Sequence, residues 1–218
     1  MDILHKKAHR WAKILGRCPG VRAIFLSGSV AEGRGTKESD IDFFIIAKSG
    51  QIWTARFFTF LVLKIFNQLA KPHHHAGKIC PNHFIADHQL KIIEQDLYSA
   101  KLFTHNIPLY DPQAIFLTFV HENKEWVKAF GEGFDNVDYK GAINCRDAIN
   151  RVSTKRTGAL QCAPTKKPRS WSDKILAPLQ ITKIKKNPDF KKKGAVIIFT
   201  DDELRFHPEP KNRHFSKS

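Results

Sequence analysis

The apolar positions in the N-terminal part of the chain change their spacing from one segment to the next. Between residues 4 and 15 they recur every three or four positions, which predicts an amphipathic helix that Gly16 ends. Residues 23–26 and 43–46 are short apolar runs bounded by Gly, Ser and Asp, and they predict two strands. We therefore expect a helix, a strand, a turn of small residues and a second strand.

The rest of the chain continues with helices and short strands. Its pattern predicts helices over residues 52–69 and 87–105 and a strand over residues 79–85. It also predicts a helix that starts at Asp111-Pro112, with Asp as the cap and Pro at the first position, and continues over residues 114–130. It then predicts a helix over 171–186 interrupted at Pro178, a strand over 195–200, a turn or helix start at 201–203 and an extended tail from Phe206.

These elements predict an α+β fold, with a small twisted mixed sheet, helices packed on one side of it and a mostly helical C-terminal part. We divide the chain into a core of residues 1–105, a helical extension of residues 106–150 and a basic, partly flexible region of residues 151–218.

Two carboxylates stand at the start of the second strand. Asp40 and Asp42 are two positions apart, so on a strand their side chains point to the same face. Unpaired charge beside an apolar run is costly, and a hard cation such as Mg²⁺ would satisfy both carboxylates. Gly28-Ser29, at the end of the first strand, lets the backbone approach a ligand and offers N–H groups to phosphate oxygens. The combination predicts a site for a metal ion and a nucleotide.

The motif Gly-Ser-x-Ala-x-Gly-x5-Ser-Asp-Ile-Asp, which covers Gly28 to Asp42, resembles the nucleotidyltransferase superfamily typified by DNA polymerase beta. Two other phosphate-binding motifs do not fit. A P-loop needs Gly-Lys-Ser/Thr after four spacers, whereas Gly33 is followed by Arg34-Gly35, and the glycine spacing is not that of a dinucleotide fingerprint.

The resemblance implies a polymerase-beta-like fold and an enzyme that moves a nucleoside monophosphate from a nucleoside triphosphate, here taken as ATP, to an acceptor hydroxyl with release of pyrophosphate. In that family Mg²⁺ ions are held by carboxylates, which map onto Asp40 and Asp42. Gly28 and Ser29 map onto the triphosphate cradle. Arg34 and Lys37, in the loop between, are expected to neutralise phosphate charge. The acceptor carries no short motif and stays open.

A third carboxylate of the family usually lies on a later strand. In the strand expected over residues 79–85, the central polar position is Asn82, which we assign to the metal site. Asn82 brings one neutral oxygen and is a poor base, and Asp87 is the nearest acid that could replace it. The alternative function is therefore a catalytically impaired nucleotide- or RNA-binding module of the same fold.

Composition adds three expectations. The net charge of the 218 residues is +15, and residues 151–218 hold 17 Lys and Arg against 6 Asp and Glu. We therefore expect there either contact with an anionic partner such as RNA or a solvated, partly disordered tail. Four scattered cysteines without a C-x-x-C motif indicate neither a zinc site nor a disulfide framework. The apolar segment over 52–69 contains Arg56 and Lys64, so we expect a buried helix, no membrane contact and a cytoplasmic protein.

Overall fold

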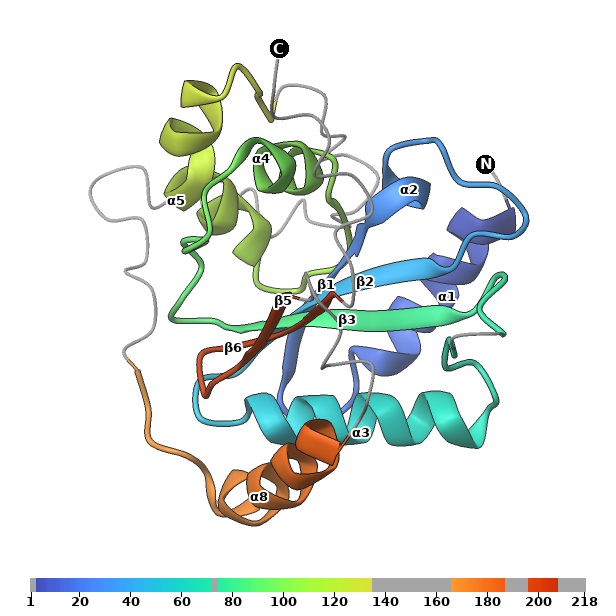
Figure 1. The fold of residues 1–218 in the computed structure, drawn as a ribbon, viewed down its shortest axis with the longest axis vertical. Coiled ribbons are helices and arrows are strands. Elements are labelled where there is room, and N and C mark those ends of the chain that lie inside the picture. Colours follow the sequence, from blue (N-terminus) through green and yellow to red (C-terminus); the bar gives the residue numbers. More distant parts are fainter. Residues whose placement is uncertain (1–2, 72–73, 135–165, 187–195, 208–218) are drawn as a thin grey trace.

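The protein, seen in a computed structural model that describes residues 3–71, 74–134, 166–186 and 196–207, is built on one mixed sheet of six strands (Figure 1). The strand order is β4-β1-β2-β3-β6-β5, in which β2 and β3 are parallel and every other pair is antiparallel. The strands are β1 (Val21–Ser27), β2 (Ile41–Ala47), β3 (Ile79–Ala86), β4 (Ile107–Tyr110), β5 (Val196–Phe199) and β6 (Glu203–His207). The predicted α+β fold with a mixed sheet is confirmed.

Helices cover both faces of this sheet, so the expectation of helices on one side was wrong. Helices α1 (Ile3–Leu15), α3 (Ile52–Ile65) and α8 (Trp171–Lys186) pack on one face, and α4 (Leu97–Thr104) and α5 (Ile115–Ala129) pack on the other (Figure 1). The reason lies in β2, where Phe43 and Ile45 belong to the first core and Phe44 and Ile46 to the second. A strand that is apolar at every position needs cover on both faces.

The segment after β3 departs most from the sequence prediction. Residues 87–96 are not helical, and Asp87 at their start accepts a hydrogen bond from the backbone N–H of Ser49. Helix α4 starts only after Asp96, whose carboxylate accepts from the N–H of Ser99 and caps the helix. The edge strand β4 was missed, since its four residues include a proline.

Helix α5 begins at Ile115, three residues later than its predicted start. Ala114 adopts a left-handed conformation with φ of 54°, which ends the preceding turn. Asp111 still acts as the cap, because its two carboxylate oxygens accept from the N–H groups of Ile115 and Phe116. The helix predicted over 52–69 ends at Ile65. Strands β1 and β2 are found where they were predicted, but each starts two residues earlier and ends one residue later than the predicted runs 23–26 and 43–46.

The C-terminal residues return to the sheet. Helix α8 runs through Pro178 without the predicted interruption. The Gln180 side chain joins it to α3 by donating to the carbonyl of Trp53. Asp201 and Asp202 form the turn between β5 and β6, as one reading of residues 201–203 predicted, and β6 replaces the start of the expected tail. Residues 135–165, 187–195 and 208–218, which hold much of the basic, partly flexible region expected over 151–218 and most of the expected tail, lie outside the described residues.

The division at residues 105 and 150 stays a prediction, although β4, β5 and β6 all join the sheet formed by β1, β2 and β3. Among the helices that the structure describes, none combines the length and the apolar character needed to cross a bilayer.

Candidate functional site

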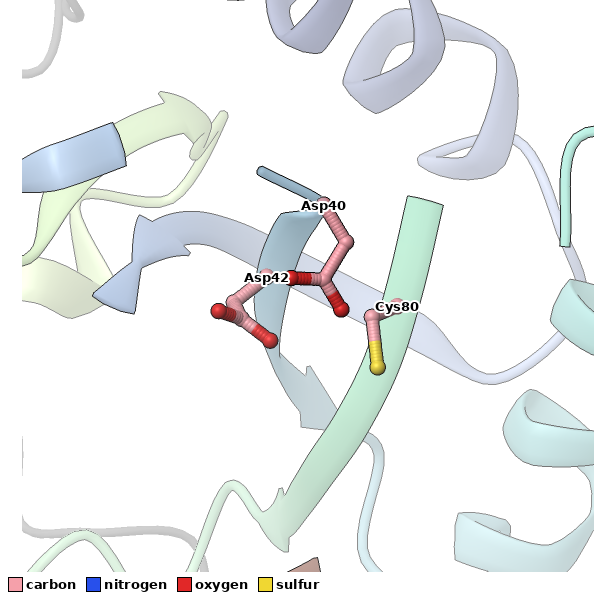
Figure 2. A group of neighbouring side chains, drawn as sticks. All are labelled: Asp40, Asp42 and Cys80. Atoms are coloured by element: carbon pink, nitrogen blue, oxygen red, sulfur yellow. The ribbon is translucent and has the colours of Figure 1, made fainter. Parts of the chain in front are cut away.

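The two predicted carboxylates meet at the start of β2. Asp42 is the second residue of the strand and lies opposite Ser27, the last residue of β1. Asp40 precedes the strand, and its carboxylate still converges with that of Asp42 (Figure 2). Both side chains are half-buried, so the pair is open to solvent at one side.

Cys80 is the third member of this group, and sequence reasoning missed it. Strand β3 runs parallel to β2 with Cys80 directly opposite Asp42. The ligand atoms of Asp40, Asp42 and Cys80 all lie within 4.8 Å of one another (Figure 2). Burial, reinforced by the charges of Asp42 and Asp40, raises the pKa of the Cys80 thiol well above its usual range. The signal that could have pointed to Cys80 is the register of β2 on β3, which a single sequence does not contain.

Asn82 lies beside Asp42, as expected, but it acts as a hydrogen-bond donor. Its amide Nδ2 donates to Oδ1 of Asp42 over 2.8 Å. Asp42 pairs with Cys80 and Phe44 pairs with His83, so β3 has one extra residue between these two pairs. Asn82 lies in this irregular stretch of β3. In this geometry Asn82 orients the Asp42 carboxylate, and its assignment as a metal ligand stays a prediction.

Gly28 is required where β1 ends. Its φ is +67°, in the left-handed region, and a Cβ built on it would collide with Oδ2 of Asp42. The backbone therefore passes against the carboxylate at van der Waals distance. Ser29 follows in the single-turn helix α2 (Gly28–Ala31), whose N-terminus has no side-chain cap. The structure thus brings the predicted Gly28-Ser29 turn and the predicted carboxylates together.

Arg34 and Lys37 lie on the exposed loop between α2 and β2. Arg34 forms an ion pair with Glu32. The guanidinium of Arg34 donates from Nε and Nη2 to the Glu32 carboxylate, and the side chain of Lys37 is exposed. Their expected role in neutralising phosphate charge stays a prediction.

Asp87 cannot complete the group. Its N–H bonds the carbonyl of Ala47, five residues along β2 from Asp42 and so roughly 17 Å away at about 3.3 Å per residue. Its carboxylate accepts from the N–H of Ser49 and lies 3.4 Å from Nε of Arg22. Asp87 therefore stabilises the C-terminal end of β3, away from Asp40 and Asp42.

The residues at the start of β2 fit a divalent cation. Two carboxylates supply hard oxygen donors, the thiol of Cys80 supplies a soft one, and Gly28 keeps one side clear of any side chain. Asp40 and Asp42 are the residues that would hold a metal ion, which would in turn draw phosphate oxygens to the Gly28-Ser29 turn.

The family to which part of the sequence is similar agrees with this geometry. Residues 10–99 match the family model described as "Nucleotidyltransferase domain", a span that includes Gly28, Asp40, Asp42 and Cys80. A solved structure titled "Crystal structure of the toxin-antitoxin with AMP-PNP" is similar with a TM-score of 0.35 and 15% sequence identity, over 56% of this chain and 86% of that one. No curated protein matches the sequence significantly.

The matched span starts inside α1 and ends inside α4. It contains the strands β1, β2 and β3 and the whole carboxylate group, but not β4, β5 or β6. Residues 10–99 of this chain carry a nucleotidyltransferase domain of the type that DNA polymerase beta represents.

Proposed function

We propose that the protein is a metal-dependent nucleotidyltransferase that transfers a nucleoside monophosphate from a nucleoside triphosphate, ATP in the first instance, to an acceptor hydroxyl. The observation that carries the proposal is the convergence of the Asp40 and Asp42 carboxylates beside the Gly28-Ser29 turn. The family model over residues 10–99 supports the same reaction class.

In the proposed reaction the acceptor oxygen forms a bond to the α-phosphorus, and the bond from that phosphorus to the bridging oxygen of pyrophosphate breaks. A bound Mg²⁺ would neutralise charge on the phosphate oxygens and align the attacking and leaving groups. Asp40 and Asp42 would hold it, and Asn82 keeps Asp42 in orientation through its 2.8 Å hydrogen bond. Gly28 and Ser29 would place backbone N–H groups against the triphosphate, with Arg34 and Lys37 offsetting its charge from the loop.

The test is transfer of label from α-³²P nucleoside triphosphates, with Mg²⁺ or with chelator, to candidate acceptors that include RNAs, proteins and aminoglycosides. We expect metal-dependent labelling of one acceptor class. We also expect ATP to bind in a metal-dependent way, which calorimetry measures. The absence of both, in protein that melts cooperatively, contradicts the proposal.

A second candidate is a nucleotide-binding module that no longer transfers. Two observations favour it: the position opposite Asp42 is a thiol whose pKa is raised, and Asn82 presents a donor instead of a third carboxylate. The substitution Asn82→Asp separates the two functions. It adds a carboxylate beside Asp42, and general-base catalysis is typically worth about 10²–10⁴-fold, so transfer should rise by at least about tenfold if the site is catalytic.

Absence of transfer in wild type and in Asn82→Asp, with ATP binding retained in both, favours the binding module. The RNA contact expected of residues 151–218 belongs to this second candidate. It rests on charge alone and stays a prediction, since much of that region lies outside the described residues.

A further inference from the structure

The position of Cys80 has a consequence for which metal ion the site takes. Cys80 projects from β3 toward the two carboxylates, and its Sγ lies with their oxygens inside one 4.8 Å group (Figure 2). The residue is partly exposed, and its sulfur lies beside the two half-buried carboxylates. Within the described residues, this is the only group of three or more His, Cys, Asp and Glu side chains close enough to share an ion.

The chemistry of this donor set differs from that of an all-oxygen site. Mg²⁺ is a hard cation that demands near-octahedral oxygen coordination. Thiolate is a soft ligand that selects Zn²⁺ and other transition ions, and the affinity of first-row ions rises from Mn²⁺ toward Zn²⁺. Since sulfur stands directly opposite Asp42, an ion held by both carboxylates would meet it as the next protein donor.

We infer that Cys80 is a thiolate ligand of the metal site and that it makes the site prefer a thiophilic divalent cation, such as Zn²⁺, over Mg²⁺. On binding, the thiol releases its proton to water and forms a bond from sulfur to the metal, without any change of oxidation state. The inference rests on the proposed function, because it refines the metal that the Asp40–Asp42 pair would hold.

The first experiment uses Co²⁺ as a spectroscopic probe on the full-length protein. A cobalt–thiolate bond gives a charge-transfer absorption in the near ultraviolet, which carboxylate ligands do not give. We expect this band in wild type and its loss in Cys80→Ser. Cys18→Ser is the matched control, because Cys18 is a buried thiol in the turn before β1, away from the carboxylates, and should keep the band.

The second experiment measures the affinities for Zn²⁺, Mn²⁺ and Mg²⁺ by calorimetry. Cys80→Ser should weaken Zn²⁺ binding by at least about tenfold, because even the loss of a residue that only supports a metal ligand typically costs about 10–100-fold in metal affinity. The affinity for Mg²⁺ should stay within about twofold. Cys80→Asp, which places an oxygen anion opposite Asp42, should shift the preference toward Mg²⁺. Thermal melting of each variant, with Cys80→Ala as a second truncation, establishes that the proteins are folded.

A cobalt band that persists in both Cys80→Ser and Cys80→Ala, or equal Zn²⁺ affinity in wild type and Cys80→Ser, overturns the inference. These outcomes are separate from failure of the proposed function. If the band depends on Cys80 while no nucleotide binds with any metal, the metal inference stands and the nucleotidyltransferase proposal falls. If ATP binds in a Mg²⁺-dependent way and substitution of Cys80 changes the affinity for no metal, the metal inference falls and the nucleotidyltransferase proposal stands.

Discussion

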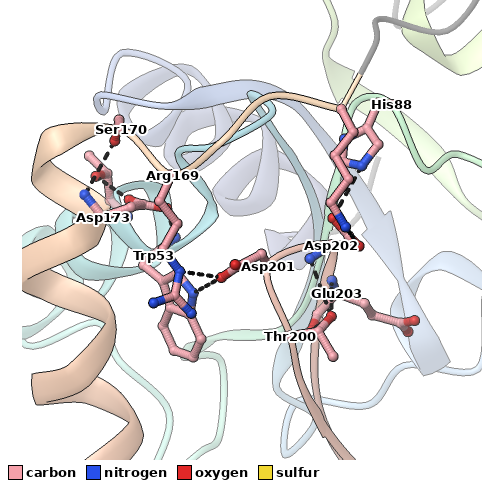
Figure 3. Close-up of polar contacts among 11 residues, drawn as sticks. Trp53, His88, Arg169, Ser170, Asp173, Thr200, Asp201, Asp202 and Glu203 are labelled. Carbon is pink, nitrogen blue, oxygen red and sulfur yellow. Dashed lines mark hydrogen bonds and ion pairs between the residues drawn. The ribbon is translucent and has the colours of Figure 1, made fainter.

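Two groups of acidic residues in this protein have opposite surroundings. At the turn between β5 and β6 and at the start of α8, acids are saturated by donors: Asp173 accepts from the N–H of Trp53 and the N–H and hydroxyl of Thr54, over 2.5–3.0 Å (Figure 3). Asp201 accepts from Nε1 of Trp53 and Nε of Arg169. At the start of β2, no salt bridge within the described residues involves Asp40.

The difference separates acids that hold the chain together from acids placed to bind something. Asp173 caps α3 from a segment more than a hundred residues away, and so ties α8 to the core. Asp40 and Asp42 instead bring like charges together next to a glycine, an arrangement that a cation stabilises. Each prediction below tests one side of this contrast.

The largest effect is expected from Asp42→Asn. Metal-assisted stabilisation of phosphoryl transfer is worth several kcal/mol, so label transfer from α-³²P ATP should fall by at least about 100-fold. The melting temperature should not fall, because the substitution removes repulsion with Asp40. The control is Glu38→Gln, which removes one exposed negative charge from the same loop and should leave transfer unchanged. Retention of transfer in Asp42→Asn would remove these acids from the site.

Asp173→Ala should lower the stability of the protein and leave its metal affinity unchanged. It leaves the N–H groups of Trp53 and Thr54 without their acceptor, and loss of such a cap with its buried hydrogen bonds should lower the free energy of unfolding by about 2–3 kcal/mol. Urea denaturation measures this. The exposed neighbour Lys174 provides the control, and Lys174→Ala should stay within about 0.5 kcal/mol. Metal affinity should be the same in all three proteins, and its loss in Asp173→Ala would mean that the two acidic groups are coupled.

Gly28→Ala and Gly33→Ala form a matched pair with a smaller expected effect. Both glycines have positive φ, of +67° and +73°, so each substitution should cost about 1–2 kcal/mol of stability. A Cβ on Gly28 would also displace the Asp42 carboxylate, whereas nothing lies within 4 Å of a Cβ on Gly33. Calorimetry should therefore show weakened metal binding only in Gly28→Ala. Equal metal affinity in the two variants would show that Asp42 does not need its observed position.

The site was more predictable from sequence than its surroundings, and the reason is the range of the contacts. Gly28, Asp40 and Asp42 lie within fifteen positions of one another, so the local motif contains their relation. Cys80 joins them only through the register of a parallel pair of strands, which depends on how both strands pack. Likewise the cap that Asp173 provides for α3 links two segments with no local relation.

Strand β6 was missed for a related reason. It lies between β3 and β5, yet two of its five residues are the buried, charged Glu203 and Arg205. Arg205 donates to Glu94 over 2.7 Å, so its charge is paired inside the fold. A strand whose charged side chains are paired with distant residues shows neither the apolar run nor the alternation by which strands are recognised in a sequence.

The smallest effect concerns Glu203, an acid of the saturated group. Its Oε1 lies 2.9 Å from Nε2 of buried His83. Burial alone would raise the pKa of Glu203, but the hydrogen bond from His83 and the charges of His83 and Arg205 outweigh it and hold the pKa below the ordinary 4.5. The folded protein therefore keeps Glu203 ionised at a pH where the unfolded chain takes up a proton. Its contribution to stability is present above about pH 4.5 and is lost as the pH falls further.

Glu203→Gln should remove this dependence. At about pH 7 the variant should be less stable than wild type by about 1 kcal/mol, the scale of one hydrogen bond to a charged group, and the gap should narrow as the pH falls through the range below about 4.5. Denaturation curves from about pH 7 to about pH 3.5 measure the gap, with the exposed Glu125→Gln as the control that should follow wild type throughout. A gap that stays constant over this range would show that Glu203 stabilises the sheet by packing and not by its charge, and it would then no longer belong with the acids that hold the C-terminal strands by paired charge.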